Sequence, residues 1–172
     1  SSPTPVSEGY YSSPLESSTV NRYEQHECET GYYCINGVRW NCGSKALYCP
    51  VQSTHPLVVD DGYYSAPLSA LETNRKEQII CPPGRYCSSG SMLNCTAGYY
   101  GSTEGQTTNE CSGKCRQGYY CREGSTTATQ NNCGGAEWYC PEGSVEPIKV
   151  ANGYYSAPIE VDKDNRYEER VC

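Results

Sequence analysis

Apolar residues occur in short groups along the chain, and no apolar run approaches the length of a membrane span. The most regular pattern is a twenty-residue stretch that occurs three times, at residues 9–28, 62–81 and 153–172. Each copy begins with Gly-Tyr-Tyr-Ser, carries Asn-Arg-x-Glu at places thirteen to sixteen and ends on a cysteine. Both segments suit short strands, and the Asn-Arg-x-Glu segment alternates its faces as it runs into the cysteine. Each copy therefore predicts a small β-hairpin with a variable acidic loop.

A proline follows each tyrosine pair, at Pro14, Pro67 and Pro158. Proline removes a backbone donor, which suits the end of an edge strand. Tyrosine supplies stiff apolar area with a polar tip, and we expect the arginine to lie on a tyrosine ring or to fork onto a carboxylate. Sugar-stacking tyrosines and a ligand-binding arginine are the alternatives. The residues that we expect to pack modules together are Tyr10, Tyr11, Tyr63, Tyr64, Tyr154, Tyr155, Arg22, Arg75 and Arg166.

The chain has 172 residues, with 13 cysteines, 2 histidines and no phenylalanine. Few aliphatic side chains are left for a core, so cross-links in an oxidising, extracellular compartment are the expected source of stability. Zinc binding is the alternative reading of the cysteines. It is disfavoured because the chain has no Cys-x-x-Cys, and His26 and His55 lie outside ligand-like spacing.

Twelve cysteines form three sets of four, spaced C-x5-C-x7-C-x6-C, C-x5-C-x7-C-x15-C and C-x5-C-x11-C-x6-C. This spacing predicts small, disulfide-rich, mostly β modules that stack into an elongated rod and are joined by short β-hairpin linkers. The expected segments are linker 1–27, module 28–50, linker 51–80, module 81–111, module 112–141 and linker 142–171. Cys172 is expected to be unpaired in this chain, as the first cysteine of a truncated fourth module.

A shift of 144 residues aligns Gly9 with Gly153 and Cys28 with Cys172, which suggests a higher-order period. We therefore expect a longer chain to continue after Cys172 with five residues and another cysteine. The alternative is that Cys172 forms a cross-link between chains.

The net charge of −7 disfavours a basic face for nucleic acid or an anionic membrane. The sequence has no nucleophile elbow and no phosphate-binding glycine loop, so we expect no enzyme activity and no cofactor. Two acidic pairs, Asp60 with Asp61 and Asp162 with Asp164, do not recur in the other copies. A calcium site needs more oxygen ligands at fixed offsets, so we expect no metal site.

Several positions are candidate glycan carriers. Asn94 begins the sequence Asn-Cys-Thr, which fits the N-glycosylation pattern. Exposed serine and threonine runs near proline suggest O-glycans, although plain soluble loops explain them equally well. The O-glycosylation candidates are Ser2, Thr4, Ser13, Ser53, Thr54, Thr103, Thr107, Thr108, Thr126, Thr127 and Thr129.

The segments CETGYYC at 28–34, CPPGRYC at 81–87 and CRQGYYC at 115–121 share a Cys-x-x-Gly-x-Tyr-Cys core. In this the chain resembles the cysteine-rich ephrin-receptor-like repeats and, more distantly, the modules of TNF receptors and growth-factor receptors. The resemblance implies pairing of first with third and second with fourth cysteines. The implied disulfides are Cys28–Cys42, Cys34–Cys49, Cys81–Cys95, Cys87–Cys111, Cys115–Cys133 and Cys121–Cys140. Sequence alone allows three connectivities for each set of four.

The expected function is structural: an extracellular glycoprotein, secreted or at the cell surface, whose repeats form a stalk, filament or fibril. Its expected partners are neighbouring repeats of the same protein, through self-association, and covalent glycans. One alternative is a receptor or adhesion ectodomain that binds a protein ligand, and a carbohydrate-binding module is the third possibility.

Overall fold

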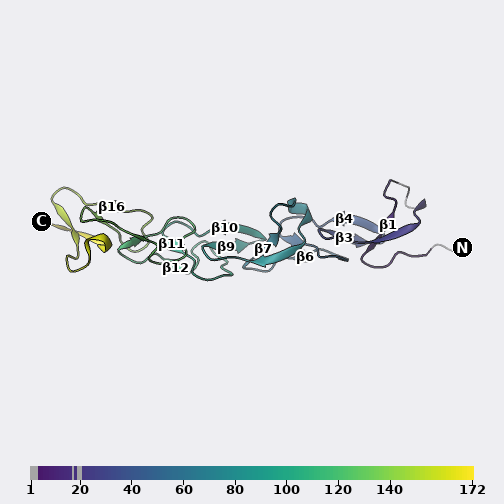
Figure 1. The fold of residues 1–172 in the computed structure, drawn as a ribbon, viewed down its shortest axis with the longest axis horizontal. Coiled ribbons are helices and arrows are strands. Elements are labelled where there is room, and N and C mark those ends of the chain that lie inside the picture. Colours follow the sequence, from purple (N-terminus) through teal and green to yellow (C-terminus); the bar gives the residue numbers. More distant parts are fainter. Residues whose placement is uncertain (1–3, 17, 19–20) are drawn as a thin grey trace. The chain divides into compact units, whose positions relative to one another are not determined.

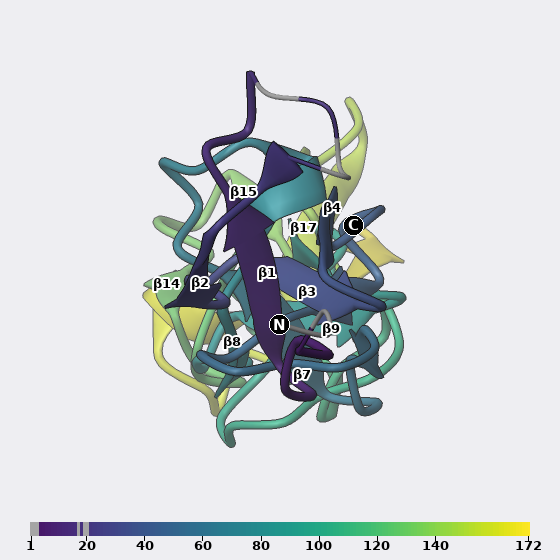
Figure 2. The ribbon, with the colours of Figure 1, turned by 90° about the vertical axis from the view of Figure 1, so that its right-hand side faces the viewer.

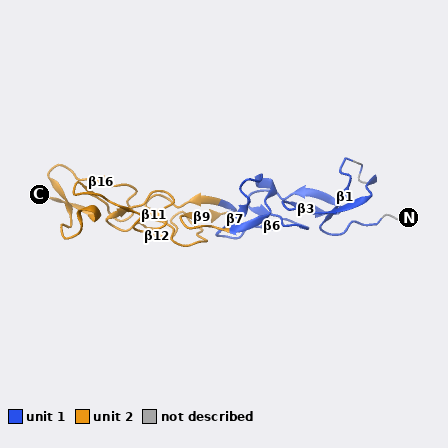
Figure 3. Ribbon diagram, in the orientation of Figure 1, with its two compact units in different colours: residues 1–79, 89–91 blue, residues 80–88, 92–172 orange. Residues whose placement is uncertain are grey.

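A computed structural model describes residues 4–16, 18 and 21–172 of the chain. In this described part, eighteen short strands pair into nine two-stranded sheets, and the helical structure consists of single 3-10 turns (Figure 1). The predicted fold class, a small disulfide-rich and mostly β protein, is confirmed. Two compact units make up the chain, residues 1–79 with 89–91 and residues 80–88 with 92–172 (Figure 3).

Each repeated twenty-residue stretch forms a linker hairpin. The paired strands are β1 (Tyr10–Ser13) with β2 (Glu24–Glu27), β7 (Tyr63–Ala66) with β8 (Glu77–Ile80), and β17 (Tyr154–Ala157) with β18 (Glu168–Val171). The strand-ending prolines follow β1, β7 and β17 directly, each after a cis peptide bond. The predicted hairpins are therefore present in all three copies.

The Asn-Arg part of the repeat does not lie in a strand, contrary to prediction. In the second and third linkers, Asn74 ends the 3-10 turn η2 (Glu72–Asn74) and Asn165 ends η3 (Lys163–Asn165). The arginine that follows has extended backbone, and the strand starts two residues later. The short turn takes the asparagine out of the strand's alternation.

Each four-cysteine module contributes a first hairpin and one strand of a closing hairpin, whose second strand lies beyond the expected end of the module. The first hairpins pair β3 (Tyr32–Ile35) with β4 (Val38–Asn41), β9 (Arg85–Ser88) with β10 (Ser91–Asn94), and β13 (Tyr119–Tyr120) with β14 (Asn131–Asn132). The closing hairpins pair β5 (Leu47–Tyr48) with β6 (Leu57–Val58), β11 (Tyr99–Tyr100) with β12 (Gly113–Lys114), and β15 (Trp138–Tyr139) with β16 (Ile148–Lys149). Asn36 and Gly37 both have positive φ between β3 and β4, as a tight two-residue hairpin turn requires.

The core of each module is made of its disulfides. Eleven of the twelve bonded cysteines are buried, and only Cys111 is half-buried. The bonds are Cys28–Cys34, Cys42–Cys49, Cys81–Cys87, Cys95–Cys111, Cys115–Cys121 and Cys133–Cys140, and Cys172 is free and exposed. Cross-links thus take the place of an aliphatic core, as the composition predicts.

The disulfide pairing implied by the receptor-like resemblance is wrong in this structure. Cysteines pair first with second and third with fourth, in place of Cys28–Cys42, Cys34–Cys49, Cys81–Cys95, Cys87–Cys111, Cys115–Cys133 and Cys121–Cys140.

The first module shows the physical reason. Cys34 lies opposite Arg39 within the β3–β4 ladder, whereas Cys42 lies beyond the end of β4. There the peptide of Gly31 joins Cys42 to Cys49: its carbonyl accepts the N–H of Cys42 at 3.2 Å, and its N–H donates to the carbonyl of Cys49 at 2.8 Å. The third and fourth cysteines are therefore held side by side, with their Cα atoms 5.7 Å apart, which suits a disulfide.

Candidate functional site

The linker hairpin binds the module before it through its Asn-Arg pair. The side-chain amide of Asn74 donates to the carbonyl oxygen of Gly31 at 3.1 Å. The carbonyl of Arg75 accepts the N–H of Cys49 at 2.9 Å. A Cβ atom on Gly31 would lie 2.5 Å from the carbonyl oxygen of Asn74, closer than real Cβ contacts, so only glycine fits this approach.

The third linker makes the same contacts within the second unit. Asn165 donates its side-chain amide to the carbonyl of Gly118 at 3.2 Å, and the carbonyl of Arg166 accepts the N–H of Cys140 at 2.9 Å. A Cβ atom on Gly118 would overlap the carbonyl of Asn165. Two linkers with different loops therefore bind the preceding module through equivalent atoms.

The other side of the linker hairpin contacts the module that follows it. We define joint 1 as the contact of β1 with the β3–β4 hairpin, which lie beside one another (Figure 2). Tyr11 forms a parallel bridge with Gly37, and Ser12 donates its N–H to the carbonyl of Gly37 at 2.9 Å. The hydroxyl of Ser12 donates to the same carbonyl at 3.2 Å.

We define joint 2 as the matching contact of β7 with the turn at residues 89–91. Tyr64 forms a parallel bridge with Gly90, and Ser65 donates its N–H to the carbonyl of Gly90 at 3.1 Å. Gly90 also abuts the main chain of Lys45, whose carbonyl oxygen a Cβ atom at position 90 would overlap. The linker hairpin therefore has two faces, one for the preceding module and one for the following module.

The repeated arginines close their own hairpins by binding main-chain carbonyls. Arg75 is only 6% exposed and donates to the carbonyl of Pro67, and Arg166 donates to the carbonyl of Ser156 at 3.1 Å. The expectation of a tyrosine ring or a carboxylate as partner is wrong for these two arginines. The carbonyls that these arginines bind belong to strand β17 and to the proline turn after β7, and a planar guanidinium can reach them from across the hairpin.

Arg22 makes the equivalent contacts in the first linker. It donates to the carbonyl of Ser12 at 3.2 Å and to that of Leu15 at 3.4 Å. The arginine thus ties the ends of the variable loop together in every copy, which explains why it recurs.

A charged cluster reinforces joint 1. The guanidinium of Arg39 lies 5.2 Å from the ring centre of Tyr11 and 4.6 Å from that of Tyr32. Glu29 accepts hydrogen bonds from the Tyr11 hydroxyl at 2.9 Å and from Arg39 at 3.0 Å. Tyr11 is 8% exposed and packs against the Cys28–Cys34 disulfide, so the cluster sits over the small core of the joint.

This cluster shifts two ionisation equilibria. Burial raises the pKa of Tyr11, and the hydrogen bond to Glu29 adds to the rise. Burial opposes ionisation of Glu29, but hydrogen bonds from its own backbone, Tyr11 and Arg39 outweigh it and lower its pKa. Near neutral pH the cluster therefore holds a neutral tyrosine, a carboxylate and a guanidinium.

The repeated tyrosines are not equally packed. Tyr11 is buried, Tyr10, Tyr63 and Tyr64 are half-buried, and Tyr154 and Tyr155 are exposed. The packing role predicted for all six is therefore visible in the first two linkers, whereas β17 presents its rings to solvent.

Sequence reasoning missed the asparagine and Arg39. The asparagine recurs in all three copies, which was a usable signal, but its assignment to a strand hid its reach to the preceding module. Arg39 had no such signal, because the aligned place in the second module holds Met92. Its partners become apparent only when the β3–β4 hairpin is placed against β1.

The glycan candidates differ in accessibility. Asn94 and Thr96 are exposed at the end of β10. Ser13 is buried and the Ser53 hydroxyl donates to the carbonyl of Pro50 at 2.7 Å, so these two serines are poor carriers. The exposed candidates are Thr4, Thr103, Thr107, Thr108, Thr127 and Thr129, whereas Thr54 and Thr126 are half-buried and Ser2 lies outside the described residues. Glycosylation itself stays a prediction.

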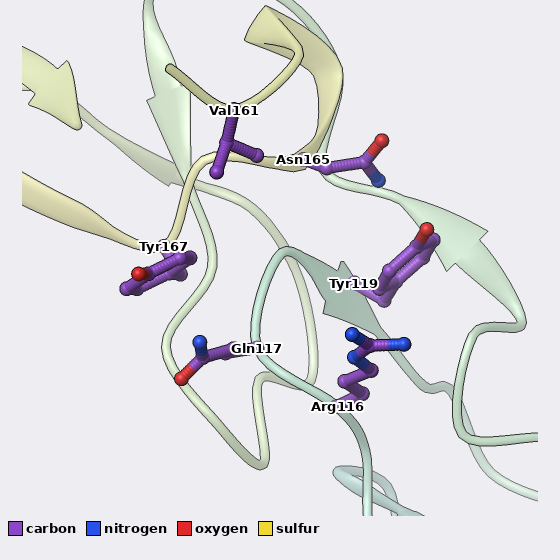
Figure 4. Close-up of a pocket in the computed structure, with 6 residues that line it drawn as sticks. All are labelled: Arg116, Gln117, Tyr119, Val161, Asn165 and Tyr167. Carbon is purple, nitrogen blue, oxygen red and sulfur yellow. The ribbon is translucent and has the colours of Figure 1, made fainter. Parts of the chain in front are cut away.

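The second unit also holds a shallow pocket of about 340 Å³ between the third module and the third linker (Figure 4). Its lining residues are Arg116, Gln117, Tyr119, Val161, Asn165 and Tyr167. Two aromatic rings beside amide and guanidinium groups could hold a small polar ring such as a sugar.

No cluster of three or more histidine, cysteine, aspartate or glutamate side chains within the described residues is arranged to hold a metal ion. The acidic pairs lie in loops: Asp60 accepts a hydrogen bond from the Gln78 side chain, and Asp162 accepts one from the N–H of Asp164. None of the helices that the structure describes has the length and hydropathy of a membrane span.

No protein-family model and no curated protein matches the chain. The functional argument therefore rests on the repeated contacts themselves.

Proposed function

We propose that the chain is a segment of a structural extracellular glycoprotein, in which linker hairpins and four-cysteine modules build a stalk, filament or fibril. The observation that carries this proposal is the two-faced linker. Asn74 and Asn165 bind the preceding module with the same atoms, while Ser12 and Ser65 bind the turn of the following module with the same atoms. Contacts that repeat with each neighbour favour a linear array.

The disulfides support an extracellular site of action, because such bonds persist in oxidising compartments. They also suit a stalk or fibril under tension, since each module is stabilised locally by its own cross-links and not by a core shared along the chain. The resemblance to ephrin-receptor-like repeats remains part of this proposal only as a likeness of cysteine spacing, because the cysteine pairing differs.

Small-angle X-ray scattering on the intact, oxidised protein tests the proposal. A compact globule of this length would have a radius of gyration of about 16 Å. We expect a value at least about twice as large, together with the scattering of a rod of constant cross-section. A compact particle would contradict the proposal. A large radius without a rod-like cross-section would show modules that move independently, and would contradict a stiff filament.

A second candidate function is binding of a carbohydrate in the pocket formed by Tyr119 and Tyr167. The aligned place in the second linker holds Lys76 instead of Tyr167, which offers a matched control. We expect retention on a glycan array that is lost in Tyr167→Lys. If the unmodified protein is retained on no glycan, the carbohydrate-binding hypothesis is wrong.

A further inference from the structure

The third linker hairpin has the same internal geometry as the first. Tyr155 pairs with Arg170 as Tyr11 pairs with His26. The N–H of Cys172 donates to the carbonyl of Gly153 at 3.0 Å, just as the N–H of Cys28 donates to the carbonyl of Gly9 at 2.8 Å. A module whose first cysteine is Cys172 would therefore leave β17–β18 in the direction in which the first module leaves β1–β2.

The forward face of this third hairpin is open at Gly153 and Tyr155, whereas Ser156 beside them is fully buried. Gly9 and Gly62 are buried, whereas Gly153 is exposed. A Cβ atom on Gly9 would lie 2.7 Å from the carbonyl oxygen of Gln52, just beyond the end of the following module, but no described residue lies within 4 Å of a Cβ atom on Gly153. Tyr155 is 38% exposed, compared with 8% for Tyr11.

The main chain of Ala136 in the third module also lies beside this face. The hydroxyl of Ser156 donates to the carbonyl of Ala136 at 2.6 Å. Ala136 occupies the place in the third module that Lys45 occupies in the first, and the main chain of Lys45 is what Gly90 packs against in joint 2. At joint 2 no described residue bonds the Ser65 hydroxyl, so the match between the two places is in the main chain of Ala136 and Lys45 and does not include the serine side chain.

We propose that the face formed by β17, with Gly153 and Tyr155 exposed, is a docking site for a further four-cysteine module that starts at Cys172 and carries a glycine nine residues after it. Gly37 and Gly90 both stand nine residues after the first cysteine of their modules. The turn glycine would bridge Tyr155 as Gly37 bridges Tyr11 and Gly90 bridges Tyr64. This inference rests on the proposed function and names the partner surface that extends the array.

The test extends the full chain after Cys172 with a copy of residues 29–59, which restores a complete first-type module. Tyrosine nitration by tetranitromethane, mapped by peptide, compares Tyr155 before and after the extension, with Tyr11 as the internal buried reference. We expect the rate at Tyr155 to fall by roughly tenfold, towards that of Tyr11, as exposure is lost. We also expect peptide mapping without reduction to show Cys172 bonded to the appended copy of Cys34.

The matched control carries Gly37→Asn in the appended copy alone. Asparagine tolerates positive φ, so the turn can still form, but its side chain would overlap the carbonyl of Ala136. This variant should form the same disulfides and leave Tyr155 reactive. Full reactivity of Tyr155 in the unaltered extension, or failure of its cysteines to pair, would overturn the proposal. Scattering from the unextended chain could still be rod-like in that case, so the two proposals fail separately.

Discussion

Joint 1 and joint 2 use the same backbone bridge but different surroundings. At joint 1, side chains surround the bridge between Tyr11 and Gly37: Val6 lies beside Gly37, and the Arg39 guanidinium lies over the Tyr11 ring. At joint 2, Gly90 lies against main-chain atoms of Lys45. Side chains can adjust by small rotations, whereas the main chain of Lys45, in the short loop closed by the Cys42–Cys49 disulfide, cannot. Joint 2 therefore depends on a glycine at position 90, which has no side chain to clash, whereas joint 1 depends on the charged cluster around Arg39.

Replacing the turn glycine by alanine should give the largest difference in lost stability between the two joints. At Gly37, a Cβ atom would lie 3.1 Å from the Val6 side chain, which can move, so the cost is mainly the positive φ, about 1 kcal/mol. At Gly90, the overlap with the Lys45 carbonyl adds a steric cost, for about 3 kcal/mol in all. Hydrogen exchange at the Ser12 and Ser65 amides measures each opening free energy. Equal losses at the two joints would contradict the distinction.

Removing the repeated arginine should have the next largest effect. Arg75 is buried, so Arg75→Gln should destabilise the second linker by about 2 kcal/mol. Arg22 is half-buried, and Arg22→Gln should cost about 1 kcal/mol. Exchange of the Lys76 and Tyr23 amides, which bond to the opposite strand at the same place in each hairpin, reports the two effects. A larger loss in the first linker would show that burial does not set the strength of this contact.

The Arg39 cluster should act on joint 1 alone. Arg39→Met installs the residue that the second module has at this place, Met92, and should loosen joint 1 by about 1 kcal/mol. Exchange at the Ser12 amide should rise accordingly, while exchange at the Ser65 amide stays unchanged. A similar rise at both amides would mean that Arg39 acts on the stability of the whole unit.

Acid should have the smallest effect, again confined to joint 1. The pKa of Glu29 is lower in the folded protein than in the unfolded chain, so its contribution is present above the unfolded value of about 4. It is lost as the pH falls through the lower folded value. The Ser12 amide should therefore lose protection below about pH 4 relative to Ser65. In Glu29→Gln this difference between the joints should disappear.

The repeats made much of the fold predictable. Three gapless copies locate the linker hairpins, and the scarcity of aliphatic residues indicates that the cysteines form the core. The disulfide pairing could not be predicted in this way, because it depends on where Gly31 turns the chain and on the β3–β4 register. A resemblance in cysteine spacing carries no information on either.

The candidate site was predictable only in part. Recurrence identified the tyrosines, the arginine and the asparagine. It did not show that the asparagine binds the preceding module, or that the serine after the tyrosine pair binds the following module. The partners of both are main-chain carbonyls, such as that of Gly31 for Asn74. Every residue has a main-chain carbonyl, so a pattern of residue types cannot predict which carbonyl is bound.

The most direct test of the two-faced linker is the detection by NMR of scalar couplings across its hydrogen bonds. A two-faced linker predicts couplings from the Ser12 nitrogen to the Gly37 carbonyl carbon and from the Ser65 nitrogen to that of Gly90. The bond from Cys28 to Gly9, within a linker hairpin, serves as the internal positive control. Detection of the control coupling without the two couplings to the turn glycines would contradict the account.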